Sequence, residues 1–102
     1  MTKKSDLKYL NHLHHLLEET IENLESVKNA KKDFIKEQEI SWTRKGSRTE
    51  GLARFKTFVE KNPDSESAKR LKDFEKRQRH LVKEIDRQKN YIDDFSSKKQ
   101  LS

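Results

Sequence analysis

The chain has 102 residues, of which 41% are charged and 29% are apolar, and its formal net charge is +6. This length suits one domain at most, and two glycines and one proline cannot supply the turns of a compact α/β enzyme. The chain contains no cysteine, which excludes disulfide scaffolds, thiolate zinc sites and cysteine nucleophiles.

A first helix is predicted from about residue 5 to about residue 40, with Ser5 as its N-cap. Alternating steps of three and four residues define a mostly apolar heptad seam, which consists of Leu10, Leu13, Leu17, Thr20, Leu24, Val27, Lys31 and Phe34. Other apolar residues widen this seam on both sides: Leu16, Ile21, Ala30 and Ile35. A stripe of this width favours a bundle of three or more helices over a simple pair.

A second, shorter helix is predicted at about 48–61. Ser47 and Glu50 have the spacing of a capping box, in which each side chain bonds the other residue's backbone N–H. One face of this helix is apolar and consists of Leu52, Phe55, Phe58 and Val59. The sequence does not decide whether the first helix continues as far as Trp42, in the segment that precedes Gly46.

A third helix is predicted at about 63–95, with Asn62 as N-cap and Pro63 as its first residue. Its seam holds an unbroken three-four spacing through Leu71, Phe74, Gln78, Leu81, Ile85, Gln88, Ile92 and Phe95. Gln78 and Gln88 weaken the seam, and polar residues at such positions often set register or oligomeric state.

These lengths predict an all-α fold in which residues 1–102 form a single helical domain with frayed ends. The two long helices must run antiparallel if their seams are to bury each other, and the short middle helix then closes one end with Trp42, Phe55 and Phe58. We therefore expect an antiparallel three-helix coiled-coil bundle, or alternatively a helical hairpin that dimerises. So small a core is marginal alone, which makes self-association physically reasonable.

Two basic elements are candidates for a nucleic-acid surface. Five cations form a stripe opposite the seam of the third helix, namely Lys69, Lys72, Lys76, Arg79 and Lys83. The turn beside Trp42 adds Arg44, Lys45 and Arg48. Such cations can contact successive phosphates, and an aromatic side chain can stack on a base. The competing interpretation is an ordinary solvated helix face and an ordinary helix connector, the tryptophan packing on the bundle end.

The charges are unevenly distributed along the chain. The outward positions of the first helix are acidic, at Glu18, Glu19, Glu22 and Glu25, whereas the outward face of the third helix is basic. This polarity argues against tight wrapping of DNA, and it favours an oriented protein partner or head-to-tail self-association.

No pattern in the sequence indicates catalysis. His12 and His15 are spaced to share a metal ion, but they supply only two ligands, so His12, His14 and His15 are better interpreted as solvent-facing. The acidic residues lie at outward positions where nothing desolvates them, and a narrow helical core leaves no room for a substrate pocket. We expect no enzyme, no cofactor, no metal and no small-molecule substrate.

The leading hypothesis is a small helical protein–protein interaction module, such as an adaptor, a regulatory subunit or an assembly factor. Its candidate partner-facing apolar residues are Leu16, Ile35, Trp42, Phe58, Val82 and Tyr91. The rival hypothesis is a nucleic-acid-binding protein that uses the two basic elements. No apolar run approaches the ~18 residues of a membrane span and no signal peptide follows Met1, so we expect no membrane insertion and a cytoplasmic or other reducing compartment.

Overall fold

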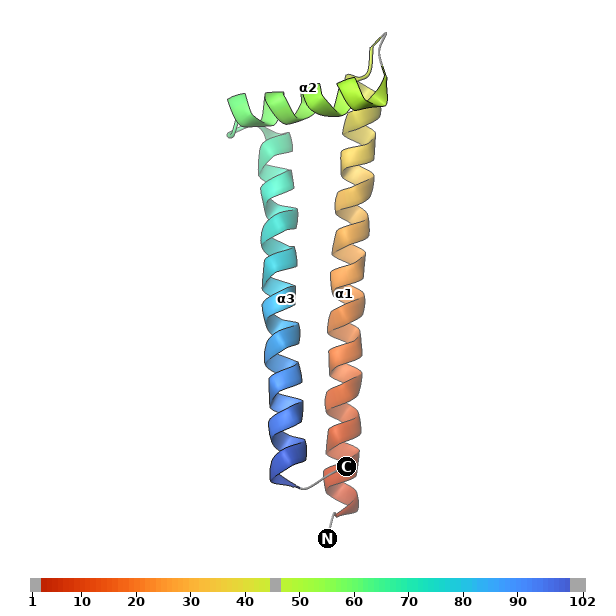
Figure 1. Cartoon of the computed structure of the whole chain (residues 1–102), viewed down its shortest axis with the longest axis vertical. Helices are drawn as coiled ribbons and strands as arrows, with labels where there is room; N and C mark the ends of the chain where they lie inside the picture. The colour runs from red at the N-terminus through yellow and green to blue at the C-terminus, as the bar shows by residue number, and fades with distance from the viewer. Residues whose placement is uncertain (1–2, 45–46, 100–102) are drawn as a thin grey trace. The chain divides into compact units, whose positions relative to one another are not determined.

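The computed structural model describes residues 3–44 and 47–99, and within these residues it contains three helices and no strand (Figure 1). Helix α1 comprises Lys4–Trp42, α2 comprises Arg48–Lys61 and α3 comprises Glu66–Lys98. The prediction of an all-α fold with two long helices and a short middle one is confirmed. Lys45 and Gly46, in the predicted basic turn, lie outside the described residues.

Helix α1 begins one residue before the predicted start and continues to Trp42, an extension that the sequence leaves open. The backbone carbonyl of Lys3 accepts bonds from the N–H groups of Asp6 (3.1 Å) and Leu7 (3.3 Å), so Ser5 lies inside the helix and its prediction as N-cap is wrong. At the other end the helix continues to Trp42, where Thr43 donates its backbone N–H to the carbonyl of Glu39 at 3.1 Å.

The start of α2 lies at the predicted place but uses a different cap. Ser47 is the N-cap residue in extended backbone conformation, but its side chain makes no capping hydrogen bond. The N–H of Glu50 instead donates to the backbone carbonyl of Ser47 at 3.0 Å. This turn already gives the Glu50 N–H an acceptor, so the predicted capping box is not formed.

The start of α3 lies later than predicted. Ser65, not Asn62, caps the helix, because its Oγ accepts a hydrogen bond from the N–H of Ala68 at 3.2 Å. The same hydroxyl donates to the carbonyl of Asn62 at 2.8 Å, which closes a turn through Pro63 and Asp64. Pro63 therefore belongs to the connection between α2 and α3 and does not begin the helix.

The chain divides into two compact units, and α1 and α3 contribute to both. Unit 1 contains residues of Met1–Glu25 and Arg79–Ser102, whereas unit 2 is Ser26–Gln78. Within unit 1, α1 and α3 run antiparallel, since Tyr9 contacts Phe95 while Leu16 lines a groove with Glu84 and Tyr91. They also run antiparallel within unit 2, since the Lys31 ammonium lies 3.8 Å from the Glu75 carboxylate, and the later Phe34 of α1 packs against the earlier Phe74 of α3.

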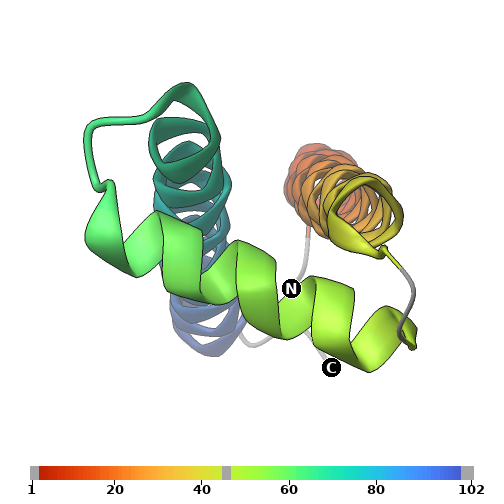
Figure 2. The same ribbon diagram turned by 90° about the horizontal axis from the view of Figure 1, so that it is seen from above.

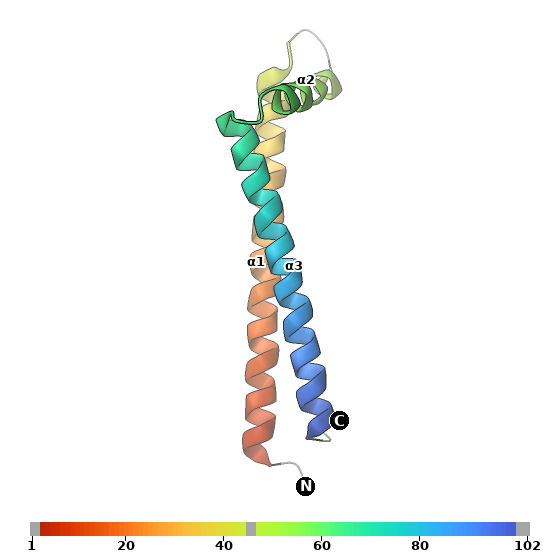
Figure 3. The ribbon, with the colours of Figure 1, turned by 90° about the vertical axis from the view of Figure 1, so that its left-hand side faces the viewer.

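Unit 2 is built around three phenylalanines, one from each helix. Phe34, Phe55 and Phe74 are 4%, 1% and 9% exposed, and the Phe34 ring lies 6.0 Å from Phe55 and 5.8 Å from Phe74 between centroids. Helix α2 crosses the ends of the α1 and α3 segments of this unit (Figure 2), and the side view in Figure 3 shows it nearly end-on. Trp42 packs against Phe58 at 5.0 Å, as the predicted aromatic closure requires.

A close approach at Gly51 holds α2 against the end of α1. A Cβ at this position would overlap the carbonyl oxygen of Glu39 and the backbone and side chain of Thr43. The guanidinium of Arg54 also donates to the carbonyl of Trp42 at 3.3 Å, which gives the C-terminal end of α1 a cationic partner. The glycine is therefore required by contact between the helices.

Unit 1 has a thinner core, to which two helices contribute among its described residues. Its buried residues lie on the predicted seams and are Thr20, Leu24, Ile85 and Ile92. The Thr20 hydroxyl is satisfied by donating to the carbonyl of Leu16 at 3.0 Å. At the far end, the Tyr9 ring packs edge-on against Phe95 at 5.0 Å, and its hydroxyl lies 3.1 Å from that of Tyr91.

Candidate protein-binding face

A shallow apolar groove of about 210 Å³ runs between the two helices of unit 1. Leu13 and Leu16 of α1 and Tyr91 and Ile92 of α3 supply its apolar walls. Ile92 is buried at the floor, whereas Leu16 and Tyr91 are 38% and 51% exposed and form the two rims. We refer to this surface as the groove face.

Apolar exposure is concentrated in unit 1. Among the described residues, seven large hydrophobic side chains are exposed, and six of them belong to unit 1: Leu7, Tyr9, Leu16, Ile21, Val82 and Tyr91. The seventh, Ile40, belongs to unit 2. The difference follows from the fold, because α2 packs in unit 2 and unit 1 has no third helix among its described residues.

Polar groups line one end of the groove. The Arg87 guanidinium lies 3.2 Å from the Glu84 carboxylate, and the Gln88 amide donates to the same carboxylate at 3.5 Å. The Gln88 Oε1 is buried and has no hydrogen-bond donor among the described residues. A seam glutamine therefore leaves an incompletely satisfied polar group beside the apolar walls.

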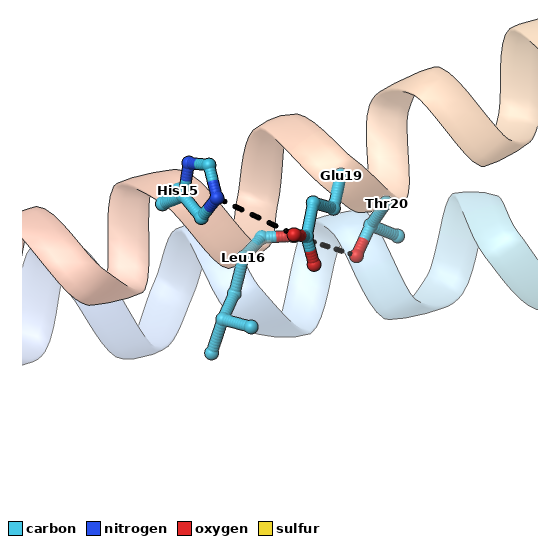
Figure 4. Close-up of polar contacts among 4 residues, drawn as sticks. All are labelled: His15, Leu16, Glu19 and Thr20. Carbon is cyan, nitrogen blue, oxygen red and sulfur yellow. Dashed lines mark hydrogen bonds and ion pairs between the residues drawn. The ribbon is translucent and has the colours of Figure 1, made fainter.

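The histidines of α1 lie at the surface, as the sequence predicts. His15 pairs with Glu19 at 3.3 Å, one turn along the helix, and Figure 4 shows this pair together with Leu16 and the bond from Thr20. His12 and His14 are also exposed. No group of three or more potential metal-ligating side chains occurs within residues 3–44 and 47–99.

The six predicted partner-facing residues separate into two groups. Leu16, Val82 and Tyr91 are exposed on unit 1, and two of them form the rims of the groove. Ile35, Trp42 and Phe58 are half-buried in unit 2, where Ile35 and Trp42 pack against the phenylalanine cluster and Phe58 packs on Trp42.

The sequence pattern does not mark three side chains of this region as partner-facing. It places Leu13 and Ile92 in the buried seams, and they reach the groove because, among the described residues, one helix covers each seam. Tyr9 carries a visible signal, since it precedes Leu16 by seven residues and so lies on the same edge of the helix.

A second, more open groove of about 400 Å³ lies in unit 2, along α2. The aromatic side chains of Trp42 and Phe58 line it together with Arg54 and Lys61. Arg44 and Arg48 of the predicted basic turn are exposed in the same unit, and Lys45 lies outside the described residues.

The predicted basic stripe of α3 is exposed throughout. Lys69, Lys72 and Lys76 belong to unit 2, and Arg79 and Lys83 belong to unit 1. Two neighbouring arginines are engaged within unit 2: Arg70 lies over the Phe34 ring at 4.8 Å, and Arg77 pairs with Asp73 at 3.1 Å.

The two units differ in charge. The sequence segments of unit 1 carry nine cations and nine acids, whereas those of unit 2 carry fifteen cations and nine acids. The entire net charge of +6 therefore belongs to unit 2. Unit 1 combines apolar exposure with electrical neutrality.

Comparison with known proteins finds no matching family model, no similar curated protein and no similar solved structure. Within the described part of the chain, none of the helices has a stretch long and apolar enough to cross a bilayer.

Proposed function

We propose that this protein is a small, non-catalytic helical module that binds another protein chain through the groove face of unit 1. The observation that carries the proposal is the apolar groove between Leu16 and Tyr91, in a unit that has two helices among its described residues. An adaptor, a regulatory subunit or an assembly factor would each use such a surface.

The shape and chemistry of the groove suit an amphipathic helix. Docked helices insert apolar anchors at spacings of three, four and seven residues into a groove of this kind. Leu13 and Ile92 provide an apolar floor, and Glu84 and Arg87 provide charged groups at its edge. Exposed patches of apolar side chains with polar rims are characteristic of protein-binding surfaces.

Affinity capture with a matched pair of variants tests this proposal. Leu16 and Ile21 are both 38% exposed on α1, but five residues separate them, which is about 140° around a helix. Of these two residues, Leu16 lines the groove and Ile21 does not. Tagged wild-type, Leu16→Glu and Ile21→Glu chains are used as baits in extract of the source cells, with and without nuclease.

We expect proteins that are captured by the wild type and by Ile21→Glu, lost with Leu16→Glu and unaffected by nuclease. Equal capture by all three baits would contradict binding through the groove face. Loss of every captured protein on nuclease treatment would contradict a protein partner.

A second candidate function is binding of nucleic acid by unit 2. It is supported by the net charge of +6 in this unit, by the exposed Lys69, Lys72 and Lys76, and by the aromatic groove beside Arg54. Phosphate contacts of this kind produce affinity that depends steeply on salt and little on base sequence.

Binding of labelled DNA and RNA at low salt tests this second candidate. We expect binding that weakens as salt rises and that is lost when Lys69, Lys72 and Lys76 are replaced by Glu. Absence of measurable binding at low salt would exclude it.

A further inference from the structure

We propose that the occupant of the groove face is a second copy of this chain, so that two copies of unit 1 together form a four-helix bundle. This inference rests on the proposed function, because it identifies the partner of the same surface. Three properties of unit 1 support it: the size of the face, the arrangement of charges along its edges and its neutrality.

The face is large enough for a dimer of moderate affinity. The segments of α1 and α3 in unit 1 are each about 20 residues long, or roughly 30 Å, and two helices side by side span roughly 20 Å. Face-to-face contact would therefore bury roughly 600 Å² on each copy. The total of about 1,200 Å² reaches the lower end of specific interfaces.

The charged groups along the edges of the face are arranged so that one copy of the face complements a second copy. Leu16 and Tyr91 lie at the same height along the two helices of the groove. One helical turn away in one direction, at a first level, α1 carries Glu19 and α3 carries Arg87. One turn away in the other direction, at a second level, α1 carries His12 and α3 carries Asp94.

Within the unit, Arg87 also lies 3.2 Å from the Glu84 carboxylate and Glu19 lies 3.3 Å from His15. The first level thus has an acid on α1 and a cation on α3, and the second has an acid on α3 and, on α1, an imidazole that can form a hydrogen bond with a carboxylate while neutral.

A second copy therefore meets a complementary polar group at each level in either two-fold orientation. If α1 lies on the partner's α3, Glu19 faces Arg87 and His12 faces Asp94. If α1 lies on the partner's α1, Glu19 faces His12, and Arg87 faces Asp94 between the two α3 helices. Complementary edges of this kind steer association and disfavour other partners.

The neutrality of unit 1 means that the two faces that would meet do not repel each other by net charge. The nine cations and nine acids of unit 1 cancel, so two copies of this unit approach without a net electrostatic penalty. The fifteen cations and nine acids of unit 2 make it a poor surface for pairing with itself.

Sedimentation equilibrium of the purified full chain over a range of concentrations tests the proposal. We expect a monomer–dimer equilibrium for the wild type. Leu16→Glu should raise the dissociation constant about 100-fold, because it places a charge at the centre of the face. Arg87→Glu should raise it about tenfold, because it sets two acids against each other twice in a symmetric dimer.

Matched controls separate the groove face from the rest of unit 1. Ile21→Glu and Lys89→Glu make the same chemical changes on the opposite flank, since Lys89 is about 200° around α3 from Arg87. Both controls should dimerise as the wild type does. Helix content is followed by circular dichroism, so that a variant that unfolds is recognised as such.

A wild-type chain that stays monomeric at all concentrations would overturn this inference. So would a dimer that Ile21→Glu disrupts and Leu16→Glu does not. The proposed function would survive either result if the capture experiment still showed loss of a different protein with Leu16→Glu, so failure of the two proposals is distinguishable.

Discussion

The tyrosine pair of unit 1 shows how a single contact determines a measurable property. The Tyr9 and Tyr91 hydroxyls are hydrogen-bonded at 3.1 Å, and this bond raises the pKa of Tyr9 above its ordinary value, with smaller contributions from burial and from the charge of the ionised Tyr91. The neutral phenol is therefore favoured in the folded protein. Its contribution to stability is present below about pH 10 and is lost as the pH rises through the raised value.

Tyr91→Phe should therefore lower the pKa of Tyr9 towards the ordinary value for tyrosine, because the phenol loses its hydrogen-bond partner. Titration followed by NMR of the tyrosine ring carbons measures it residue by residue. The variant should also lose less stability above pH 10 than the wild type does. An unchanged pKa in the variant would show that the hydroxyl contact is not its cause.

Gly51 is the residue at which α2 meets the end of α1. Gly51→Ala should destabilise the protein by about 1–3 kcal/mol, because its Cβ would overlap the Glu39 carbonyl and Thr43, and overpacking against backbone is costly. This figure is the net loss, after the ~1 kcal/mol by which alanine is ordinarily favoured over glycine in a helix offsets part of the steric cost. Urea unfolding followed by Trp42 fluorescence measures the change.

Thr57→Ala serves as the control for this substitution, since Thr57 is exposed on the same helix and its hydroxyl donates to the carbonyl of Ala53 within that helix. It should change the free energy of unfolding by no more than about 0.5 kcal/mol. A Gly51→Ala chain more stable than the wild type would contradict the close approach of the two helices.

At the scale of the elements, the seam of α3 contains a buried polar side chain, Gln88, whose hydrogen-bonding groups are not all paired among the described residues. The Gln88 amide has one long hydrogen bond, to Glu84, and a buried Oε1 without a donor in the described residues. Gln88→Leu should raise the free energy of unfolding by about 1–2 kcal/mol, because it removes an unsatisfied buried group and extends the apolar seam. Thermal unfolding followed by circular dichroism measures this gain.

Glu84→Gln is a useful companion variant, because it keeps the shape of the partner and removes its charge. It should leave helix content unchanged and lower stability slightly. If Gln88→Leu were less stable than the wild type, the amide would be making a contact that outweighs the unsatisfied oxygen.

The helices themselves could be predicted because their patterns are long. In α1 and α3 the three-four spacing continues over many turns, and Leu24, Phe34, Phe74, Ile85 and Ile92 are buried where this spacing places them. Helix ends depend on one or two hydrogen bonds, so several residues compete for each cap. Ser65 replaced Asn62 in this way, and the Ser47 carbonyl replaced its hydroxyl.

The candidate site could be predicted only in part. Leu16 and Tyr91 stand beside the seams in the sequence, and their exposure follows from that position. Trp42 and Phe58 are large apolar residues like Leu16 and Tyr91, so residue type does not distinguish the two pairs. Trp42 and Phe58 are half-buried because α2 crosses the helix ends in unit 2, and no local sequence pattern specifies that crossing. The division of apolar and basic surface between the two units is likewise a consequence of the tertiary contacts.

At the scale of the whole molecule, aromatic residues report on each unit separately. The single tryptophan, Trp42, belongs to unit 2, and the two tyrosines, Tyr9 and Tyr91, belong to unit 1. Phe55→Ala should cost about 3–5 kcal/mol, because it empties the centre of the phenylalanine cluster of unit 2.

Because Phe55→Ala destabilises unit 2, it should lower the urea midpoint of the Trp42 fluorescence transition more than the midpoint of the tyrosine ring signals. Equal movement of both signals would show that the two units unfold as one cooperative body, and would remove the basis for treating the groove face as an independently stable surface.

The central claim is that the groove face of unit 1 is covered by a second copy of this chain, and thiol labelling tests it most directly. The chain has no cysteine, so Leu16→Cys and Ile21→Cys each introduce a single reactive thiol at sites of equal exposure. Their rates of reaction with a maleimide are compared in dilute and in concentrated protein. We predict that the rate at residue 16 falls as the protein concentration rises while the rate at residue 21 stays constant; equal rates at all concentrations, or protection of residue 21 alone, would contradict the account.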